Sequence, residues 1–592
     1  MKKKDKKDKK KIFIVDDDPD FVLATKTILE NNSYECECAY SAEEAMKKVK
    51  KVKPDLIILD VMMEHITAGF GVVNRLRNPD KNSPFYDCSK IPILIITSIQ
   101  EVMETDFHQI AGTQLLPVDE FLEKPVPSEI LVSKVNSLTK TISFEELLAK
   151  AKKPGEDAMK LHPFYHGKIA VIPKCSIRDF NDFAIWYTPG VAEPCRDIEK
   201  NPEKVYEHTN KANLVAVVSD GTRVLGLGDI GPEAGLPVME GKAILFKYLG
   251  GVDAFPIMLD TKDPDEIITA CKWLKPTFGG INLEDIAQPK CFYILNKLRE
   301  ELDIPVWHDD QQGTAAVVVA GVINAVKFVG KELDKVLIAQ LGIGAAGASV
   351  VRILIKAGVP PGNIRVVDLV GGKPTILTSD MDLEELFPYR GEMLSRTNKD
   401  KIKGSTKEAM KDADVMISFT VPGPEVVKGV WVSQMAKDSI VFPCANPVPE
   451  IWPWEAKEAG AKIVGTGRSD FPNQVNNSLG FPGIFRGALD VRAETITDEM
   501  CIAAAYELAR CAEDKGLSEE YIVPKMDEWE VYPREATAVG MKAIEQGIAS
   551  IKMSEEELYQ KAESTIRHAR EETEALMENG FIKDIPPELK KE

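Results

Sequence analysis

Residues 336–347 read Val-Leu-Ile-Ala-Gln-Leu-Gly-Ile-Gly-Ala-Ala-Gly, and this stretch decides the fold class of the region around it. An apolar run, predicted to be a strand, leads into three glycines: Gly342, Gly344 and Gly347. An apolar helix is predicted over 348–357, and a second strand over 364–367 ends at Asp368. Strand, glycines, helix and distal acid together indicate a Rossmann-type α/β fold, in which the glycines bring a dinucleotide pyrophosphate close to a helix N-terminus.

The acid at the end of the second strand bears on which dinucleotide would bind. Asp368 would accept a hydrogen bond from a ribose 2′-hydroxyl and repel a 2′-phosphate, which favours NAD. Arg365 and Lys373 are close in sequence and could serve a 2′-phosphate, so NADP stays possible. A tight strand–helix turn that binds no ligand is the other interpretation of the glycines.

Two adjacent pairs of acids lie upstream of this region, each at the end of an apolar run. The pairs are Glu284-Asp285 and Asp309-Asp310. Acids at the carboxyl ends of parallel strands converge on the crevice where an open α/β sheet binds ligands. Carboxylates gathered there repel one another unless a hard divalent cation neutralises them, so Mg²⁺ or Mn²⁺ is expected. Solvated helix starts are the alternative explanation of such pairs.

Length and composition limit the classes of protein that are possible. The 592 residues suffice for three or four domains, and 44% hydrophobic with 28% charged residues is typical of a globular protein. The net charge of −19 argues against nucleic acid as a partner. Ten cysteines without a CxxC pair are typical of reduced thiols in a cytoplasmic protein. No signal peptide or membrane-spanning run is predicted.

Alternating strands and helices indicate an α/β protein, and its expected divisions are as follows. We expect a basic tail (1–11), a parallel α/β domain (12–140), a polar linker (141–158), a second α/β domain (159–316), the dinucleotide-binding domain (317–496) and a helical C-terminal segment (497–592). The last helix is predicted from about Ser554 to Asn579, because Glu, Arg and Lys recur there at i,i+4 spacing.

Polar residues follow each predicted strand of the first domain. The strands are expected at 12–15, 56–59, 93–96 and 120–123. Because the carboxyl ends of parallel strands share one edge, Asp60 could accept a phosphoryl group there, with Mg²⁺ held by Asp16 and Asp17. Thr97 and Lys124 could then contact the transferred phosphoryl oxygens.

With these residues in order, the segment resembles the receiver domain of two-component response regulators. The resemblance implies a flavodoxin-like fold, phosphorylation of Asp60 by a sensor histidine kinase, and Mg²⁺ bound by Asp16, Asp17 and Asp60. It also implies a switch formed by three residues: Thr97, Phe121 and Lys124. A pseudo-receiver that serves only as a docking module is the alternative.

Two further residues suggest proton transfer beside the acid pairs. Lys242 lies at a glycine turn that enters a predicted helix, and a neighbouring metal and dinucleotide could lower its pKa enough to make it a base. Tyr187 lies in a Thr-Pro-Gly turn that would present its phenol. Taken singly, a packing tyrosine and a surface lysine are the simpler interpretations.

From about residue 159 onward, the chain resembles malic enzymes of the bacterial and archaeal type. The matching segments are 187–194, 219–229, 237–243, 278–286, 308–315, 445–447, 467–473 and 476–483. The resemblance implies oxidative decarboxylation of L-malate to pyruvate and CO₂ with reduction of NAD(P)⁺, in a homodimer or larger assembly. It also implies three metal ligands: Glu284, Asp285 and Asp310.

The same resemblance implies roles for the remaining site residues. Lys242, paired with Asp309, would remove the C2 hydroxyl proton, and Tyr187 would protonate the enolate left by decarboxylation. Two asparagines would bind substrate near the nicotinamide: Asn446 and Asn477. Arg223 would bind a malate carboxylate, with a surface arginine as the alternative.

The resulting hypothesis is a malic enzyme tuned by phosphorylation of Asp60. The alternatives are a signalling protein whose malic-enzyme region is a non-catalytic scaffold, and an active enzyme with a constitutive docking domain.

Overall fold

The computed structural model describes residues 10–32, 34–63, 68–77, 84–85, 88, 91–97, 120–139, 144–468 and 470–589. The chain divides into two compact units, Met1–Lys153 and Pro154–Glu592. Most of the expected basic tail lies outside the described residues. Within the described ranges, no helix combines the length and apolar character that a membrane span requires.

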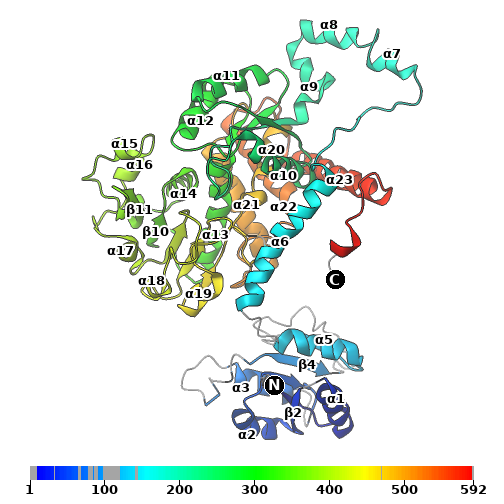
Figure 1. Cartoon of the computed structure of the whole chain (residues 1–592), viewed down its shortest axis with the longest axis vertical. Coiled ribbons are helices and arrows are strands. Elements are labelled where there is room, and N and C mark those ends of the chain that lie inside the picture. The colour runs from blue at the N-terminus through cyan, green and yellow to red at the C-terminus, as the bar shows by residue number, and fades with distance from the viewer. Residues whose placement is uncertain are drawn as a thin grey trace, which may run out of the picture. The chain divides into compact units, whose positions relative to one another are not determined.

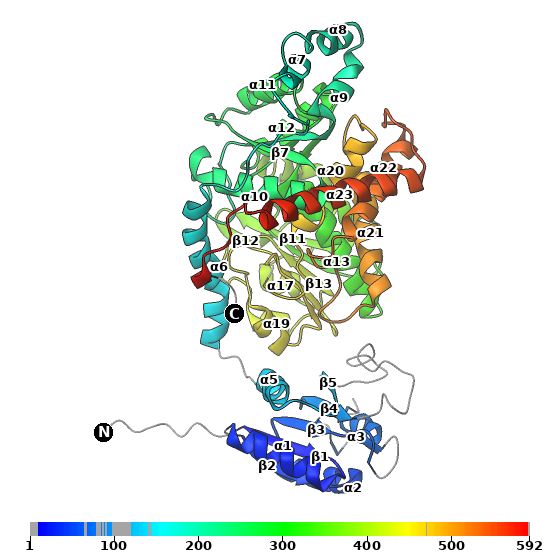
Figure 2. The same cartoon turned by 90° about the vertical axis from the view of Figure 1, so that its right-hand side faces the viewer.

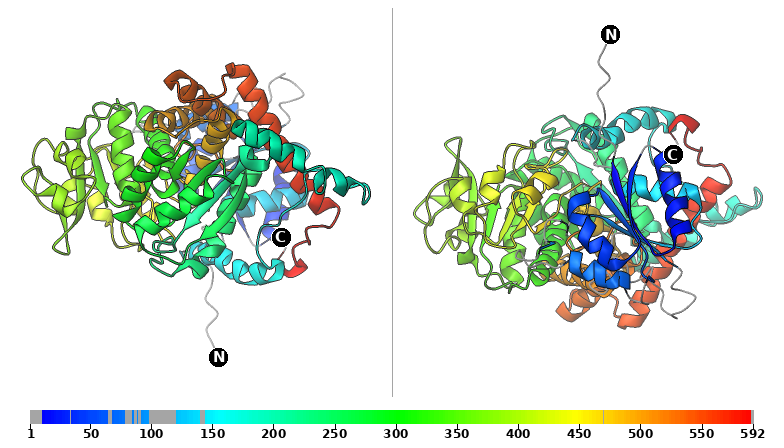
Figure 3. Two further views of the ribbon diagram at one scale, coloured as in Figure 1. Left: turned by 90° about the horizontal axis from the view of Figure 1, so that it is seen from above. Right: turned by 90° about the horizontal axis from the view of Figure 1, so that it is seen from below.

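The first unit is a five-stranded parallel sheet with the order β2-β1-β3-β4-β5. Its strands are β1 (Lys11–Val15), β2 (Glu35–Ala39), β3 (Leu56–Leu59), β4 (Ile93–Thr97) and β5 (Glu120–Glu123). Its helices include α1 (Pro19–Asn31), α2 (Ala42–Val52), α3 (Ala68–Leu76) and α5 (Ser128–Thr139). Alternate residues of β1 enter two cores, with Phe13 facing α2 and α3 and Ile14 facing α1 and α5. Figure 3 shows this sheet with helices on both faces.

Two local features differ from the sequence-based expectation. The edge strand β2 was not expected, because its Glu-Cys-Glu-Cys-Ala sequence lacks a continuous apolar run; it pairs with β1 and exposes Glu35 and Glu37. The polar stretch that we expected to be a linker is largely helical, because it lies within α6 (Phe144–Tyr165). The division between the two units falls inside this helix.

The second unit contains two sheets, of which the first is fully parallel. Its order is β7-β6-β8-β9. The strands are β6 (Leu214–Ser219), β7 (Asp253–Met258), β8 (Gly280–Leu283) and β9 (Val306–His308), connected by α10 (Pro232–Gly250), α11 (Pro264–Leu274) and α12 (Lys290–Glu301). Leu283 of β8 pairs with His308 of β9, so the two acid pairs that follow these strands begin at the same level of the sheet.

The other sheet of this unit has the order β12-β11-β10-β13-β14-β15, with only the edge strand β12 antiparallel (Figure 1). Its strands are β10 (Ile338–Leu341), β11 (Ile364–Val370), β12 (Lys373–Ile376), β13 (Val415–Ser418), β14 (Ile440–Pro443) and β15 (Ile463–Val464). The helices packed with it include α13 (Thr314–Phe328), α14 (Ala345–Lys356), α17 (Thr406–Met410), α18 (Gly429–Val432) and α19 (Pro453–Glu458). Ile338 packs in the core shared with α13 and α14, whereas Ala339 packs in the core shared with α17 to α19. Both faces are therefore covered, as a Rossmann sheet requires.

The C-terminal segment is helical, as expected. It contains α20 (Phe481–Asp490), α21 (Asp498–Lys515), α22 (Val531–Gln546) and α23 (Glu555–Glu578). The last helix is capped by Ser554, whose hydroxyl accepts from the Glu557 amide, and it ends at Asn579. Figure 2 shows α23 lying across the helices of this unit, where it contacts α10, α20 and α22.

Candidate functional site

The two acid pairs meet at the carboxyl ends of β8 and β9. One carboxylate oxygen from each of Glu284, Asp285 and Asp310 lies within 4.8 Å of the others. The Asp285 amide donates to Asp310 Oδ2 at 2.9 Å, and the Asp285 backbone has a φ of +53°, a left-handed conformation that aims its side chain into the cluster. The sequence-predicted metal ligands are therefore brought together in space.

The electrostatics of this cluster favour a bound cation. Burial, followed by repulsion from Asp310, raises the pKa of Asp285 to about 8. Burial also raises the pKa of Glu284 well above its usual range. Asp285 Oδ2 is buried and has no hydrogen-bond partner among the described residues. Three oxygen donors with such an orphaned acceptor fit Mg²⁺ or Mn²⁺, which would neutralise the repulsion.

Lys242 of α10 lies between the two acid pairs. Its Nζ is 2.5 Å from Asp309 Oδ2 and 3.1 Å from Glu284 Oε1, and it lies 4.3 Å from the centre of the Phe481 ring. We expected a lowered pKa for Lys242, but the structure gives a raised one. Burial lowers the pKa, whereas Asp309 and Glu284 raise it above its ordinary value. The lysine is therefore joined directly to an acid that favours its charged form.

The turn that follows β9 holds Asp309 in place. Asp309 Oδ1 accepts from the Trp307 indole at 3.1 Å, and the next residues form one π-helical turn, Asp309–Gly313. A Cβ at Gly313 would lie 1.9 Å from Asp309 Oδ1 and 3.3 Å from the Asn477 Cβ. Only glycine leaves room for Asp309 at this position, and Asn477 lies directly beside the turn.

The turn at residues 342–347, called the nucleotide turn below, has the geometry that its glycines predict. Gly342 has a φ of +82°, and a Cβ at Gly347 would lie 2.1 Å from the Gly342 carbonyl oxygen. Asp368 Oδ2 accepts from the Ile343 amide at 2.7 Å, which fixes the acid beside the turn. Gly344 ends the loop as the N-cap residue of α14. This turn could hold a pyrophosphate at the α14 N-terminus.

The remaining predicted substrate residues lie on loops that contact one another or the acid cluster. Arg223 is exposed, and its backbone amide donates to the Asp285 carbonyl at 2.9 Å. A Cβ at Gly226 would lie 2.2 Å from the Asn446 carbonyl oxygen, so the loop that carries Arg223 touches the loop after β14. The loops that carry Arg223, Asn446 and Asp285 are therefore neighbours.

Tyr187 is the predicted residue that the structure does not bring to this site. Its side chain is 71% exposed, and it follows the short helix α7 (Asp182–Trp186). In Figure 1, α7 stands apart from α10, the helix that carries Lys242. Among the described residues, the side-chain ion pairs and hydrogen bonds of Lys242 go to acids, and none goes to a tyrosine.

Sequence reasoning missed two groups near the site. Arg390 donates from Nη1 to Gln288 Oε1 and to the Ile343 carbonyl, each at 2.6 Å, and so connects the metal-side loop to the nucleotide turn. Asp220, at the end of β6, pairs with Lys290 at 2.5 Å. Asp220 could have been found as a third acid at a strand end, whereas no sequence signal marks Arg390.

The first unit has a separate carboxylate site at the ends of its strands. Lys124 Nζ lies 2.8 Å from Asp16 Oδ2 and 2.6 Å from Asp60 Oδ2. Burial raises the pKa of Asp16, and Thr97 Oγ1 is buried with no partner among the described residues. Asp17 is exposed. These residues fit a Mg²⁺ ion and a phosphoryl group. Phe121 lies in β5 opposite Ile95, with its side chain outside the described part.

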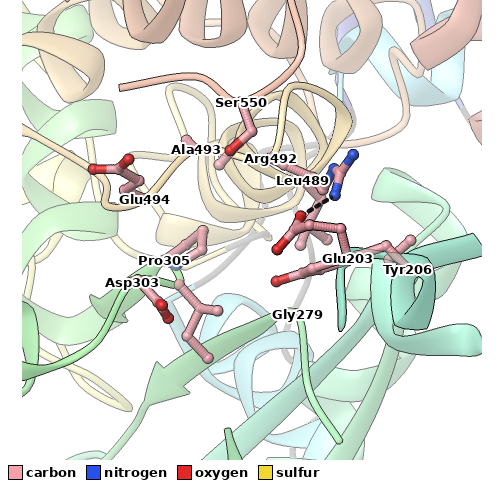
Figure 4. Close-up of a pocket in the computed structure, with 13 residues that line it drawn as sticks. Glu203, Tyr206, Gly279, Asp303, Pro305, Leu489, Arg492, Ala493, Glu494 and Ser550 are labelled. Carbon is pink, nitrogen blue, oxygen red and sulfur yellow. Dashed lines mark hydrogen bonds and ion pairs between the residues drawn. The ribbon is translucent and has the colours of Figure 1, made fainter. Parts of the chain in front are cut away.

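A cavity of about 210 Å³ lies at the other end of the parallel sheet (Figure 4). Gly279 and Pro305, which precede β8 and β9, line it together with Arg492, whose guanidinium pairs with Glu203 at 2.8 Å. Ligands of open α/β sheets bind at the carboxyl ends of strands. This cavity is therefore distinct from the acid cluster.

Comparison with known families places these features in context. Residues 12–136 match the response regulator receiver domain, residues 166–299 the malic enzyme N-terminal domain, and residues 460–544 the malic enzyme NAD-binding domain. The chain belongs to the malic enzyme family and carries a receiver domain at its N-terminal side.

Individual relatives agree with this assignment. The chain is 49% identical to the bifunctional malic/malolactic enzyme of Bacillus subtilis over 69% of its own length and 97% of that protein. It is 50% identical to the NAD-dependent malic enzyme of Geobacillus stearothermophilus, over 65% of this chain and 78% of the relative. The crystal structure of malic enzyme from Pyrococcus horikoshii shares 59% identity and a TM-score of 0.67, covering 69% of this chain and 96% of that one.

Titration with Mn²⁺ should distinguish the two carboxylate sites. We expect two bound ions per chain by electron paramagnetic resonance, because each site offers buried carboxylates without enough neutralising charge. Asp310→Asn should remove one ion, Asp60→Asn the other, and the double variant both. The matched control Asp229→Asn, an exposed acid paired with Lys262, should keep two. Two ions retained in Asp310→Asn would contradict the ligand assignment.

Proposed function

We propose that this protein oxidatively decarboxylates L-malate to pyruvate and CO₂ while reducing NAD⁺. The observation that carries the proposal is Lys242, held between Glu284 and Asp309 in the unit that also contains the nucleotide turn. Several relatives are named NAD-dependent or NADP-dependent malic enzymes, which supports the reaction class. The intact acids and lysine argue against a non-catalytic scaffold.

The residues divide the reaction between them. Lys242 would give a proton to Asp309 and then take the C2 hydroxyl proton, while C2 would give its hydride to the nicotinamide. Glu284, Asp285 and Asp310 would hold Mg²⁺ or Mn²⁺. When bound, the dication supplies positive charge that polarises the C2 oxygen, stabilises the enolate formed by CO₂ loss, and opposes the effect of the acids on the Lys242 pKa. A phenol, assigned to Tyr187, would protonate the enolate carbon to give pyruvate.

Three side chains would orient malate for this chemistry. Arg223 extends from the loop whose backbone touches Asp285, so its guanidinium can clamp a substrate carboxylate near the metal. Asn446 and Asn477 border the same space from the nucleotide-binding domain and would hydrogen-bond malate beside the nicotinamide. Such positioning supplies part of the rate enhancement, because it holds the reacting atoms in line.

Replacing the base tests the reaction. Lys242→Ala should lower malate-dependent NAD⁺ reduction with Mn²⁺ by about 100-fold or more, because general-base transfer typically contributes that much. Circular dichroism should show an unchanged fold. The matched control Lys262→Ala, an exposed lysine outside the cluster, should retain full turnover. Substantial activity in Lys242→Ala would refute the base assignment, and an inactive wild-type protein would refute the reaction itself.

The preference for NAD rests on Asp368. Both oxygens of this acid accept hydrogen bonds from backbone amides, those of Ile343 at 2.7 Å and Leu369 at 2.6 Å, so its negative charge is held within β11, beside the turn. Arg365 is occupied elsewhere, because its Nη1 donates to the Lys411 carbonyl at 2.7 Å. Lys373 is exposed and is the one of the two expected cations that could still reach a 2′-phosphate.

Neutralising this acid should shift the preference. Asp368→Asn keeps an acceptor for the Ile343 amide but removes the charge that repels a 2′-phosphate. We expect kcat/KM for NADP⁺ relative to NAD⁺ to rise about tenfold or more, equivalent to about 1.4 kcal/mol. Asp334→Asn, at an exposed acid away from the turn, is the control. An unchanged ratio in Asp368→Asn would remove the basis for the NAD preference.

We further propose that a sensor histidine kinase phosphorylates Asp60 and thereby controls the enzyme. The support is the set of buried Asp16 and Asp60 with Lys124 within 2.8 Å of both. The transferred phosphoryl group would displace Lys124 from Asp60 and give Thr97 Oγ1 a hydrogen-bond acceptor. A receiver that acts only as a docking module is the competing function.

Beryllofluoride, which mimics the phosphoryl group on aspartate, separates these two possibilities. We expect it to change either the turnover rate by about fivefold or the oligomeric state, since coupling between sites is typically of this size. The response should disappear in Asp60→Asn. If beryllofluoride changes neither the turnover rate nor the oligomeric state, the result would favour a receiver that acts only as a docking module.

A further inference from the structure

Arg390 is a buried cation that forms no ion pair in the described part of the chain. It lies between two short helices, α15 (Leu383–Leu386) and α16 (Gly391–Ser395), which are labelled in Figure 1. The residue is only 7% exposed, and burial lowers the pKa of its guanidinium more than nearby acids raise it. Its described contacts are carbonyl oxygens, one side-chain amide and the rings of Phe292 and Phe387. A buried charge without a counter-ion is unfavourable, so the position favours an anion nearby.

The same side chain joins two loops. One nitrogen, Nη1, donates to Gln288 Oε1 and to the Ile343 carbonyl, each at 2.6 Å. Gln288 lies on the loop that carries Asp285, a proposed metal ligand, and Ile343 lies inside the nucleotide turn. The two loops also face each other directly, because a Cβ at Gly344 would lie 3.8 Å from Gln288 Nε2. Arg390 therefore bridges the loops at which two different ligands are proposed to bind.

The bond to Gln288 links the nucleotide-binding domain to residues 284–290, which we call the metal loop. The other hydrogen bonds of the metal loop stay among residues 159–316. For example, the Asp285 amide donates to Asp310, and the Ala287 amide donates to Thr222 Oγ1 at 2.9 Å. Among the described residues, no second hydrogen bond joins the metal loop to residues 317–496. A change at the nucleotide turn therefore reaches the metal loop most directly through the arginine.

Arg390 also keeps a donor for an anion. Its Nε donates to the Pro388 carbonyl at 3.3 Å and its Nη1 makes the two bonds to the loops, whereas Nη2 has no acceptor among the described residues. A pyrophosphate at the nucleotide turn would place negative charge beside the Ile343 carbonyl. Guanidinium groups bind phosphate oxygens through charge-assisted hydrogen bonds. The dinucleotide would thus supply the counter-charge that this arginine lacks.

We infer that Arg390 is a positioning residue through which the dinucleotide and the divalent metal each strengthen the binding of the other. This inference rests on the proposed malic enzyme reaction, which requires both ligands. Arg390, fixed by the pyrophosphate, would hold Gln288 and so keep the metal loop in the arrangement that gathers its acids. Because coupling between two sites is reciprocal, a bound metal would raise the affinity for the dinucleotide by the same factor.

Binding measurements without malate test this coupling separately from turnover. Mn²⁺ is titrated by electron paramagnetic resonance into full-length Asp60→Asn protein, so that only the ion of the malic-enzyme site is counted. Saturating NAD⁺ should lower the Kd for Mn²⁺ by about fivefold or more, and saturating Mn²⁺ should lower the Kd for NAD⁺ by the same factor in calorimetry. ADP-ribose, which has the pyrophosphate but no nicotinamide, should act as NAD⁺ does.

Two variants in the same background locate the coupling. Gln288→Leu, at an exposed position, should bind NAD⁺ alone as the parent does, because Arg390 remains, but its Kd for Mn²⁺ should no longer respond to NAD⁺. Arg390→Gln should lose the response and also bind NAD⁺ about tenfold more weakly, because a charge-assisted bond to phosphate is lost. The matched control is Arg396→Gln, at an exposed arginine of the same segment, which should keep the full response.

The outcomes separate this inference from the proposed function. If the protein turns over malate but its Kd for Mn²⁺ does not change with NAD⁺, the coupling is overturned. A full response in Gln288→Leu, or a lost response in Arg396→Gln, would also overturn it. A response to NAD⁺ without one to ADP-ribose would overturn the role of the pyrophosphate. A protein that shows the coupling but does not turn over malate would overturn the proposed reaction instead.

Discussion

The buried ion pairs of Lys242 are the interaction on which the catalytic half of this protein depends. The Lys242 ammonium lies 2.5 Å from the Asp309 side chain and 3.1 Å from that of Glu284, and all three residues are buried. Removing either partner from such a group leaves an uncompensated charge, which typically costs about 3–5 kcal/mol. The strand ends, Gly313 and the Trp307 indole hold these charged groups in place beside one another.

Much of this arrangement could be predicted from the sequence, for a clear physical reason. Acids at the ends of neighbouring parallel strands lie close together. The apolar runs that precede these acids therefore predict both the acid cluster and the Asp16–Asp60 site. The nucleotide turn was also predictable, because glycines lack a Cβ and mark places where two backbone segments approach closely. The last helix was predictable from its charge spacing, and the structure adds the serine cap at its start.

The sequence-based predictions that differ from the structure also have physical reasons. The strand β2 lacks an apolar run because it is an edge strand with one face exposed to solvent. The polar stretch around Lys152 forms part of α6 despite Pro154. Asp17 follows β1 as expected, yet it is exposed, whereas Asp16 is buried. Tyr187 is the most instructive case. A motif marks this phenol as a candidate, but the sequence does not show that its side chain is exposed and stands apart from Lys242.

Arg390 connects two loops that the acid cluster itself does not join. Its guanidinium bonds simultaneously to Gln288 on the metal side and to the carbonyl inside the nucleotide turn, and it stacks over Phe292 and Phe387. Moving these two loops apart would break both hydrogen bonds, at a cost of about 3 kcal/mol or more. The arginine therefore ties the loop after β8 to the nucleotide turn, and both loops are held in one arrangement by a single side chain.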